Sequence, residues 1–159
     1  MYVPSVGTIT KALGIERAQI EGGHLKHVSL NVETLRLFLQ FIALAADYDE
    51  ATYLEENPDV AAAYEAGQIA DLRLHFVQVG YFEGRRASRL CVDQDWYCST
   101  YPDVANAIRE DVIPSAEVHF LSRGEIEWRA PNATSLPWTR AWADALSHPQ
   151  RPDHAAISP

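Results

Sequence analysis

Cysteine is scarce in this chain of 159 residues, which contains only Cys91 and Cys98. Two thiols are too few for a disulfide scaffold, and no nearby cysteine or histidine completes the spacing of a zinc site. We therefore expect both to be reduced packing residues, with a redox pair or an intermolecular bridge as the alternative. No cofactor is predicted.

Positive charge is also in short supply, because 13 lysines and arginines face 22 aspartates and glutamates, for a formal net charge of −9. So acidic a surface repels the phosphate backbone of nucleic acids unless basic residues cluster locally. The sequence contains no such cluster. The charge balance therefore argues against a nucleic-acid partner.

Long apolar runs are missing as well. The longest covers residues 35–46 and is interrupted by Arg36 and Gln40, whereas a membrane-spanning helix needs about 20 predominantly apolar residues. The first residues also lack the basic start and apolar stretch of a secretory signal. We expect a cytoplasmic protein without a membrane span.

What the chain does have is an internal repeat. Residues 48–88 align without a gap on residues 92–132, at a constant offset of 44. Thirteen of the 41 aligned pairs are identical, and they fall where helix starts, turns and packing residues are expected. The identical pairs are Asp49/Asp93, Tyr53/Tyr97, Pro58/Pro102, Asp59/Asp103, Val60/Val104, Ala61/Ala105, Ala63/Ala107, Ile69/Ile113, His75/His119, Phe76/Phe120, Gly80/Gly124, Glu83/Glu127 and Arg85/Arg129.

Each repeat is predicted to fold into three short helices. Asp49 or Asp93 caps the first helix, which must stop before Pro58 or Pro102 because proline disfavours the α conformation of its predecessor. The second helix begins at that proline, and in the first repeat we expect the Asn57 side chain to cap it.

The third helix of each repeat is expected to begin at Asp71 or Ser115. It is expected to end at Gly80 or Gly124, where glycine readily adopts a left-handed closing conformation. The predicted apolar face of this helix consists of Leu72, Leu74, Phe76 and Val79 in the first repeat and Val118, Phe120 and Leu121 in the second.

Two acidic residues lie near the starts of the second helices, where the helix dipole favours negative charge. We expect Asp59 to meet Arg85 and Asp103 to meet Arg129, which would join the start of the second helix to the closing turn.

The histidines are the most obvious catalytic candidates. His75 and His119 recur with the repeat, whereas an active site is normally a single constellation, so we expect each imidazole to bridge its own turn or the adjacent one. His24 and His27 are spaced for one helix face but have no nearby carboxylate or thiolate to complete a metal site. We predict no catalytic residue and no metal site.

The repeat resembles a short helical repeat found beside glycosyltransferase domains of bacterial surface-polysaccharide loci and in some large calcium-binding exported proteins. The matching residues of the first copy are Tyr53, Leu54, Asn57, Pro58, Asp59, Val60, Ala61, His75, Phe76, Gly80, Glu83, Gly84 and Arg85. The second copy departs from the pattern at Tyr101 and Trp128. The resemblance covers about half the chain and implies an accessory or docking module. The glycine-rich calcium-binding nonapeptides of the exported relatives are missing, so no calcium is expected.

The residues before the repeats are less regular. Residues 31–47 predict a long, largely apolar helix capped by Asn31, which would be either a central helix wrapped by the repeats or a surface shared by two chains. Residues 8–23 weakly match a helix-turn-helix, because Leu13-Gly14-Ile15 and Ile20 occupy its turn and packing positions.

The residues after the repeats predict one more helix. Residues 136–146 suit a short helix with Trp138, Trp142 and Leu146 on one face. Such a stripe either packs on the domain or marks a partner surface. The residues after this helix contain three prolines and few apolar side chains, which is typical of a mobile tail.

Together these features predict an all-α protein with an N-terminal arm (1–30), an apolar core or association helix (31–47), two tandem three-helix repeats of about 44 residues (48–91 and 92–132), a tryptophan-bearing helix (133–147) and a mobile tail (148–159).

The expected function is that of a non-enzymatic scaffold that binds a partner protein, such as a glycosyltransferase of a bacterial surface-polysaccharide system, and forms homo-oligomers. The candidate partner contacts are Trp138, Trp142, Tyr81, Phe82, Ile126, Phe38 and Phe41. One alternative is a DNA-binding regulator using residues 8–23. Another is a carbohydrate-binding or enzymatic domain, which requires a pocket with His75 or His119 exposed beside a carboxylate.

Overall fold

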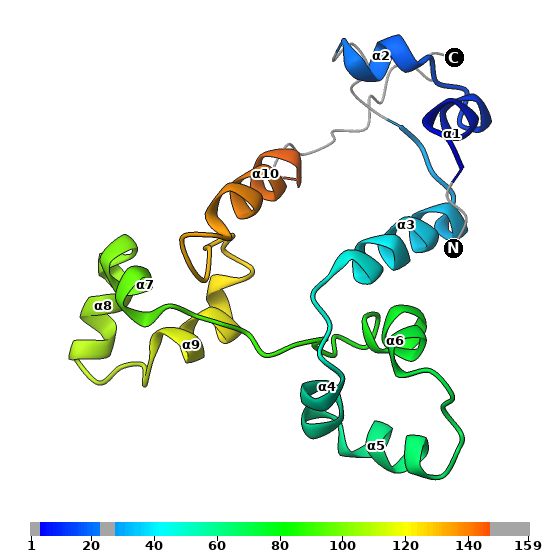
Figure 1. Cartoon of the computed structure of the whole chain (residues 1–159). Helices are drawn as coiled ribbons and strands as arrows, with labels where there is room; N and C mark the ends of the chain where they lie inside the picture. Colours follow the sequence, from blue (N-terminus) through cyan, green and yellow to red (C-terminus); the bar gives the residue numbers. More distant parts are fainter. Residues whose placement is uncertain (1–3, 23–27, 147–159) are drawn as a thin grey trace, which may run out of the picture. The chain divides into compact units, whose positions relative to one another are not determined.

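The computed structural model describes residues 4–22 and 28–146 (Figure 1). Within these residues all regular structure is helical and no strand occurs, so the predicted all-α class is confirmed. Residues 1–3, 23–27 and 147–159 lie outside the described part, and with them His24, His27 and the predicted tail. None of the described helices combines the length and the apolar character that crossing a membrane requires.

The chain divides into two compact units, residues 1–89 and 90–159. The first contains α1 (Val6–Ala12), α2 (Arg17–Glu21), α3 (Val32–Ala45), α4 (Glu50–Glu56), α5 (Pro58–Glu65), α6 (Leu72–His75) and the π-helical turn η1 (Phe76–Gly80). The second contains α7 (Gln94–Thr100), α8 (Pro102–Arg109), α9 (Ala116–His119), the π-helical turn η2 (Phe120–Gly124) and α10 (Leu136–Leu146). Every bound from α4 to η1 reappears, shifted by 44, from α7 to η2.

Local hydrogen bonds start the helices at the predicted places. The caps accept a hydrogen bond from the backbone N–H three residues on, and they are Asn31 (α3), Asp49 (α4), Asp71 (α6), Asp93 (α7) and Ser115 (α9). α5 and α8 begin at Pro58 and Pro102. Proline is well suited to the first position of a helix, because a backbone N–H there would have no partner within the helix.

Asn57 does not cap α5, so that prediction is wrong. The side chain turns inward and is buried, with Nδ2 donating to the Tyr53 carbonyl at 2.7 Å and Oδ1 accepting from Arg85 at 2.9 Å. A buried amide requires partners at both ends, and the interior of the unit supplies them.

The left-handed closing residues also differ from the prediction. They are Gly84 at φ 75° and the aligned Trp128 at φ 56°, four positions after the expected glycines. A second left-handed pair, Gly67 at φ 71° and Asp111 at φ 55°, follows α5 and α8.

Gly80 and Gly124 have a different role. A Cβ atom at Gly80 would overlap the hydroxyl of Tyr53, and one at Gly124 would overlap the hydroxyl of Tyr97. Both glycines are buried inside the π-helical turns. Close packing therefore explains glycine at these positions.

Each unit has its own core around a fully buried tyrosine. Tyr53 packs with Ala43, Val60, Leu72, Phe76, Val77 and Ala87. Tyr97 packs with Val104, Ala116 and Phe120. The predicted apolar face of the third helix is only partly right, because Leu74, Val79, Val118 and Leu121 are at least 40% exposed. Leu74 and Val118 each lie two positions from the buried residues of their helix (Leu72 and Phe76, Ala116 and Phe120) and therefore point away from the core.

The predicted long apolar helix is wrong. α3 has 14 residues, and its apolar side chains are not covered on most sides, since Val32 is 76% and Leu37 50% exposed. Only Ala43 of α3 is buried.

Arg36 of α3 is exposed, but its side chain contacts the π-helical turn η1. Arg36 donates to the Gln78 carbonyl of η1 at 3.2 Å, and its guanidinium lies 4.4 Å from the centre of the Phe82 ring. Because the arginine stem packs well on apolar surface while its head finds polar partners, this side chain docks α3 on η1.

Candidate functional site

A tyrosine–histidine pair joins the first and third helices of each repeat. The Tyr53 hydroxyl lies 3.1 Å from His75 Nδ1, and the Tyr97 hydroxyl lies 3.0 Å from His119 Nδ1. Burial raises the pKa of Tyr53, and it raises the pKa of Tyr97 to about 12, so both phenols keep their protons at neutral pH. Each histidine thus reaches back to the first helix, which the sequence did not predict.

An arginine closes each repeat, and the predicted aspartate–arginine pairs are present. The ion pairs are Arg85–Asp59 and Arg85–Glu83 in the first unit, and Arg129–Asp103 and Arg129–Glu127 in the second, all at 2.7 Å. Each aspartate accepts from two guanidinium nitrogens, which is the strong bidentate geometry. These hydrogen bonds hold the pKa of Asp59 and of Asp103 below the usual value.

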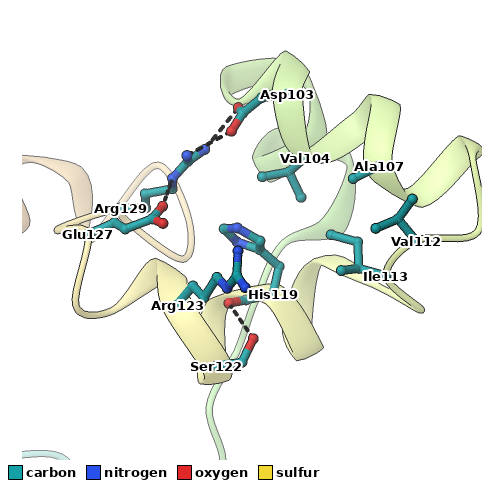
Figure 2. Close-up of a pocket in the computed structure, with 10 residues that line it drawn as sticks. All are labelled: Asp103, Val104, Ala107, Val112, Ile113, His119, Ser122, Arg123, Glu127 and Arg129. Atoms are coloured by element: carbon teal, nitrogen blue, oxygen red, sulfur yellow. Dashed lines mark hydrogen bonds and ion pairs between the residues drawn. The ribbon is translucent and has the colours of Figure 1, made fainter.

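The second unit contains a pocket of about 510 Å³ beside its tyrosine–histidine pair (Figure 2). α8 and the loop after it provide an apolar wall, while α9, η2 and the closing turn provide polar side chains. The lining residues are Asp103, Val104, Ala107, Val112, Ile113, His119, Ser122, Arg123, Glu127 and Arg129. Figure 2 shows the His119 ring between the apolar wall and Arg129.

Most polar groups of this pocket are already engaged. Asp103 and Glu127 both bind Arg129, and the Ser122 hydroxyl donates to the Val118 carbonyl at 2.7 Å. Arg123 is the exception, because within the described residues its guanidinium makes no hydrogen bond or ion pair.

His119 is buried, with 8% of its surface exposed. Burial, and to a smaller extent the nearby charge of Arg129, lower the pKa of His119, so the imidazole is neutral at pH 7. The carboxylates beside it are held by arginine, and the histidine is not exposed as the enzymatic or carbohydrate-binding alternative requires. The arrangement therefore suits binding better than proton transfer.

The two cysteines differ in their exposure to solvent. Cys98 is half-buried, but Cys91 is exposed and so is not a packing residue. Among the described residues, no three histidine, cysteine or carboxylate side chains gather to hold a metal ion.

The tryptophan-bearing helix presents its apolar stripe to solvent. α10 has the predicted bounds and no buried residue. Trp138 is 71%, Trp142 45% and Leu146 60% exposed.

The other candidate contacts lie in two places. Phe38 and Phe41, both half-buried, line an apolar groove of about 690 Å³ between α1 and α3. At the ends of the repeats, Tyr81 is half-buried, Phe82 is 39% exposed and Ile126 is 82% exposed.

Sequence reasoning missed Arg123 and Val112, and it placed Leu121 on the apolar packing face of the third helix, whereas Leu121 is exposed. All three stand where the repeats differ, opposite Val79, Gln68 and Val77. The positions that differ between the two copies therefore carry the signal for these residues, whereas the identical positions mark the shared fold.

Comparison with known proteins adds no assignment, since no family model, curated protein or solved structure matches the chain. The resemblance to a polysaccharide-associated helical repeat thus stays a prediction.

Proposed function

We propose that the chain is a non-enzymatic, cytoplasmic scaffold of two tandem helical repeats that binds a helix of a partner protein. The observation that carries this proposal is a surface that is covered in the first repeat and open in the second. We call the second-repeat version, formed by Leu121, Ser122 and Ile126, the open face.

In the first unit, α3 covers the corresponding surface. Val77 is only 7% exposed, and Arg36 of α3 contacts Gln78 and Phe82. Arg73 donates to the Leu44 carbonyl at the C-terminal end of α3, at 2.9 Å.

In the second unit, the aligned residues are exposed. Leu121 is 46% and Ile126 82% exposed, against 7% for Val77 and 39% for Phe82. The residues before α7, 85–93, contain no helix that would take the part of α3. Burying a large aliphatic side chain stabilises a complex by about 1.5–3 kcal/mol, so the open face suits an amphipathic helix.

The charge at one end of the open face narrows the chemistry of that helix. Glu117 stands where the first repeat has Arg73, which binds the C-terminal carbonyl of α3. A carboxylate repels the negative end of a helix dipole and attracts a basic side chain there. We therefore expect the partner helix to carry lysine or arginine in its last turn.

The resemblance to the glycosyltransferase-associated repeat indicates where such a helix would come from. Our proposed partner is a glycosyltransferase of a bacterial surface-polysaccharide system. The exposed stripe on α10 is a separate surface, to which we assign self-association into homo-oligomers. No observation favours the DNA-binding alternative, since α2 spans only Arg17–Glu21 and Glu16 precedes it.

A photo-cross-linking amino acid at Ile126 tests the partner proposal in the producing cell. We expect cross-links to a helix in a protein that carries a glycosyltransferase domain. The matched control places the same amino acid at Phe82, where α3 is the neighbour, so its cross-links should stay within the chain. Cross-links from Ile126 that also stay within the chain would contradict the proposal.

Charge substitutions provide a second test. Leu121→Asp with Ile126→Asp should abolish capture of the cross-linked partner while circular dichroism stays unchanged. Leu74→Asp is the control, because Leu74 is about as exposed as Leu121, at 50% against 46%, but lies in the first unit. Equal loss of capture with both variants would argue against the open face.

Sedimentation velocity tests the assignment of α10. Trp138→Ser with Trp142→Ser should shift the chain from oligomer to monomer without affecting capture of the partner. An unchanged sedimentation coefficient would contradict self-association through α10.

A further inference from the structure

The pocket of the second unit is built from two kinds of positions. Its frame residues Asp103, His119, Glu127 and Arg129 are identical in the first repeat. Two residues that give it its binding character are not, since Arg123 replaces Val79 and Val112 replaces Gln68. The fold of the repeat requires the first kind but not the second.

Arg123 is a cation without a protein partner in the described structure, although the whole chain carries a net charge of −9. The nearest carboxylates of the pocket do not compete for it, because Asp103 and Glu127 bind Arg129. An unpaired guanidinium favours a planar anion that can accept hydrogen bonds from two of its N–H groups.

The opposite wall of the pocket is aliphatic. Val104, Ala107, Val112 and Ile113 project from α8 and its following loop, facing the polar side across the cavity (Figure 2). His119, which is neutral, lies between the two walls. The cavity therefore combines one unpaired positive charge, that of Arg123, with an apolar surface on the opposite side. Its volume of about 510 Å³ lies in the range of small-molecule sites.

We propose that this pocket binds a small monocarboxylate with a short aliphatic chain. The carboxylate accepts hydrogen bonds from Arg123, and the chain lies on Val104, Val112 and Ile113. A single negative charge fits better than a phosphate dianion, because the oxygens of Asp103 and Glu127 line the same cavity. This pocket adjoins the open face, with which it shares Ser122, and none of its lining residues belongs to α10.

Hexanoate is the probe for the first experiment, with the full chain followed by heteronuclear NMR. We expect saturable shifts of the Val112 and Ile113 methyl groups and of the Arg123 side-chain N–H. Hexanol, which has the chain without the charge, should bind about tenfold more weakly or worse, since a hydrogen-bonded charge is lost. Inorganic phosphate should not compete with hexanoate.

Variants locate the site. Arg123→Val, which installs the residue of the first repeat, should weaken hexanoate binding about tenfold or more without changing the fold. Arg140→Val is the matched control on α10 and should leave affinity unchanged. The reciprocal change, Val79→Arg with Gln68→Val, should create hexanoate binding in the first unit.

Three results would overturn the proposal. They are an absence of saturable shifts with hexanoate, equal affinity for hexanoate and hexanol, and equal affinity of the wild-type chain and Arg123→Val. Phosphate binding as tight as hexanoate binding would also refute the monocarboxylate class.

Discussion

The two repeats share an internal frame but differ in what they present outside it. In both, the hydroxyl of a buried tyrosine is hydrogen-bonded to a histidine and packs against a glycine at a position that has no room for a Cβ atom. In both, an arginine also forms ion pairs with two carboxylates. The first repeat then uses its outer face to hold α3, whereas the second leaves that face open. Identity between the copies therefore marks folding, and difference marks the candidate binding surfaces.

The closing turn is a second instructive difference. Both copies place one residue in the left-handed region, but the first has Gly84 there and the second has Trp128. A side chain at positive φ costs about 1–2 kcal/mol, so the second repeat tolerates a strained turn that the first avoids.

The largest effect that we predict is that of a single added methyl group. Gly80→Ala and Gly124→Ala should each destabilise their own unit by about 3 kcal/mol, because the new Cβ would displace a buried tyrosine hydroxyl. Residue-resolved hydrogen exchange would show which unit opens. Equal protection in the variants and the wild-type chain would refute the shared frame.

Sequence reasoning succeeded where a signal was local. The caps Asp49, Asp93, Asp71 and Ser115 start their helices as predicted, because a capping side chain needs only the N–H groups three residues on. The bounds of α10 followed in the same way from local helix signals.

It failed where a distant contact decided the outcome. The Asn57 side chain was predicted to cap α5, but it instead accepts a hydrogen bond from Arg85, which lies 28 residues away in the sequence. Gly80 leaves room for the hydroxyl of Tyr53, and Arg36 donates a hydrogen bond to the carbonyl of Gln78. The pocket could not be foreseen either, because Arg123 and Val112 meet only once α8 and η2 are packed.

The strained turn provides the next prediction. Trp128→Gly should stabilise the second unit by about 1 kcal/mol by relieving the positive φ, whereas Gly84→Ala should destabilise the first by a similar amount. Urea denaturation of both variants checks this. A destabilised Trp128→Gly variant would mean that the contacts of the indole outweigh the backbone strain.

The smallest expected effect is a pH dependence in the second unit. Because the pKa of His119 is lowered in the folded state, the unfolded chain binds the proton more tightly. The contribution of His119 to stability is therefore complete above about pH 6.5 and is lost as the pH falls towards the lower folded-state pKa.

His119→Gln should flatten this dependence, measured as the midpoint of thermal unfolding between about pH 7 and pH 5. A profile identical to that of the wild-type chain would exclude His119 as its source.

The most direct test of the shared frame is a pair of double-mutant cycles. Gly80→Ala is combined with Tyr53→Phe, and Gly124→Ala with Tyr97→Phe, because phenylalanine removes the hydroxyl that the new Cβ meets. We predict that each double variant is more stable than the sum of its single changes by about 1 kcal/mol or more, with the same sign in both cycles. Additive changes in either cycle would contradict the account.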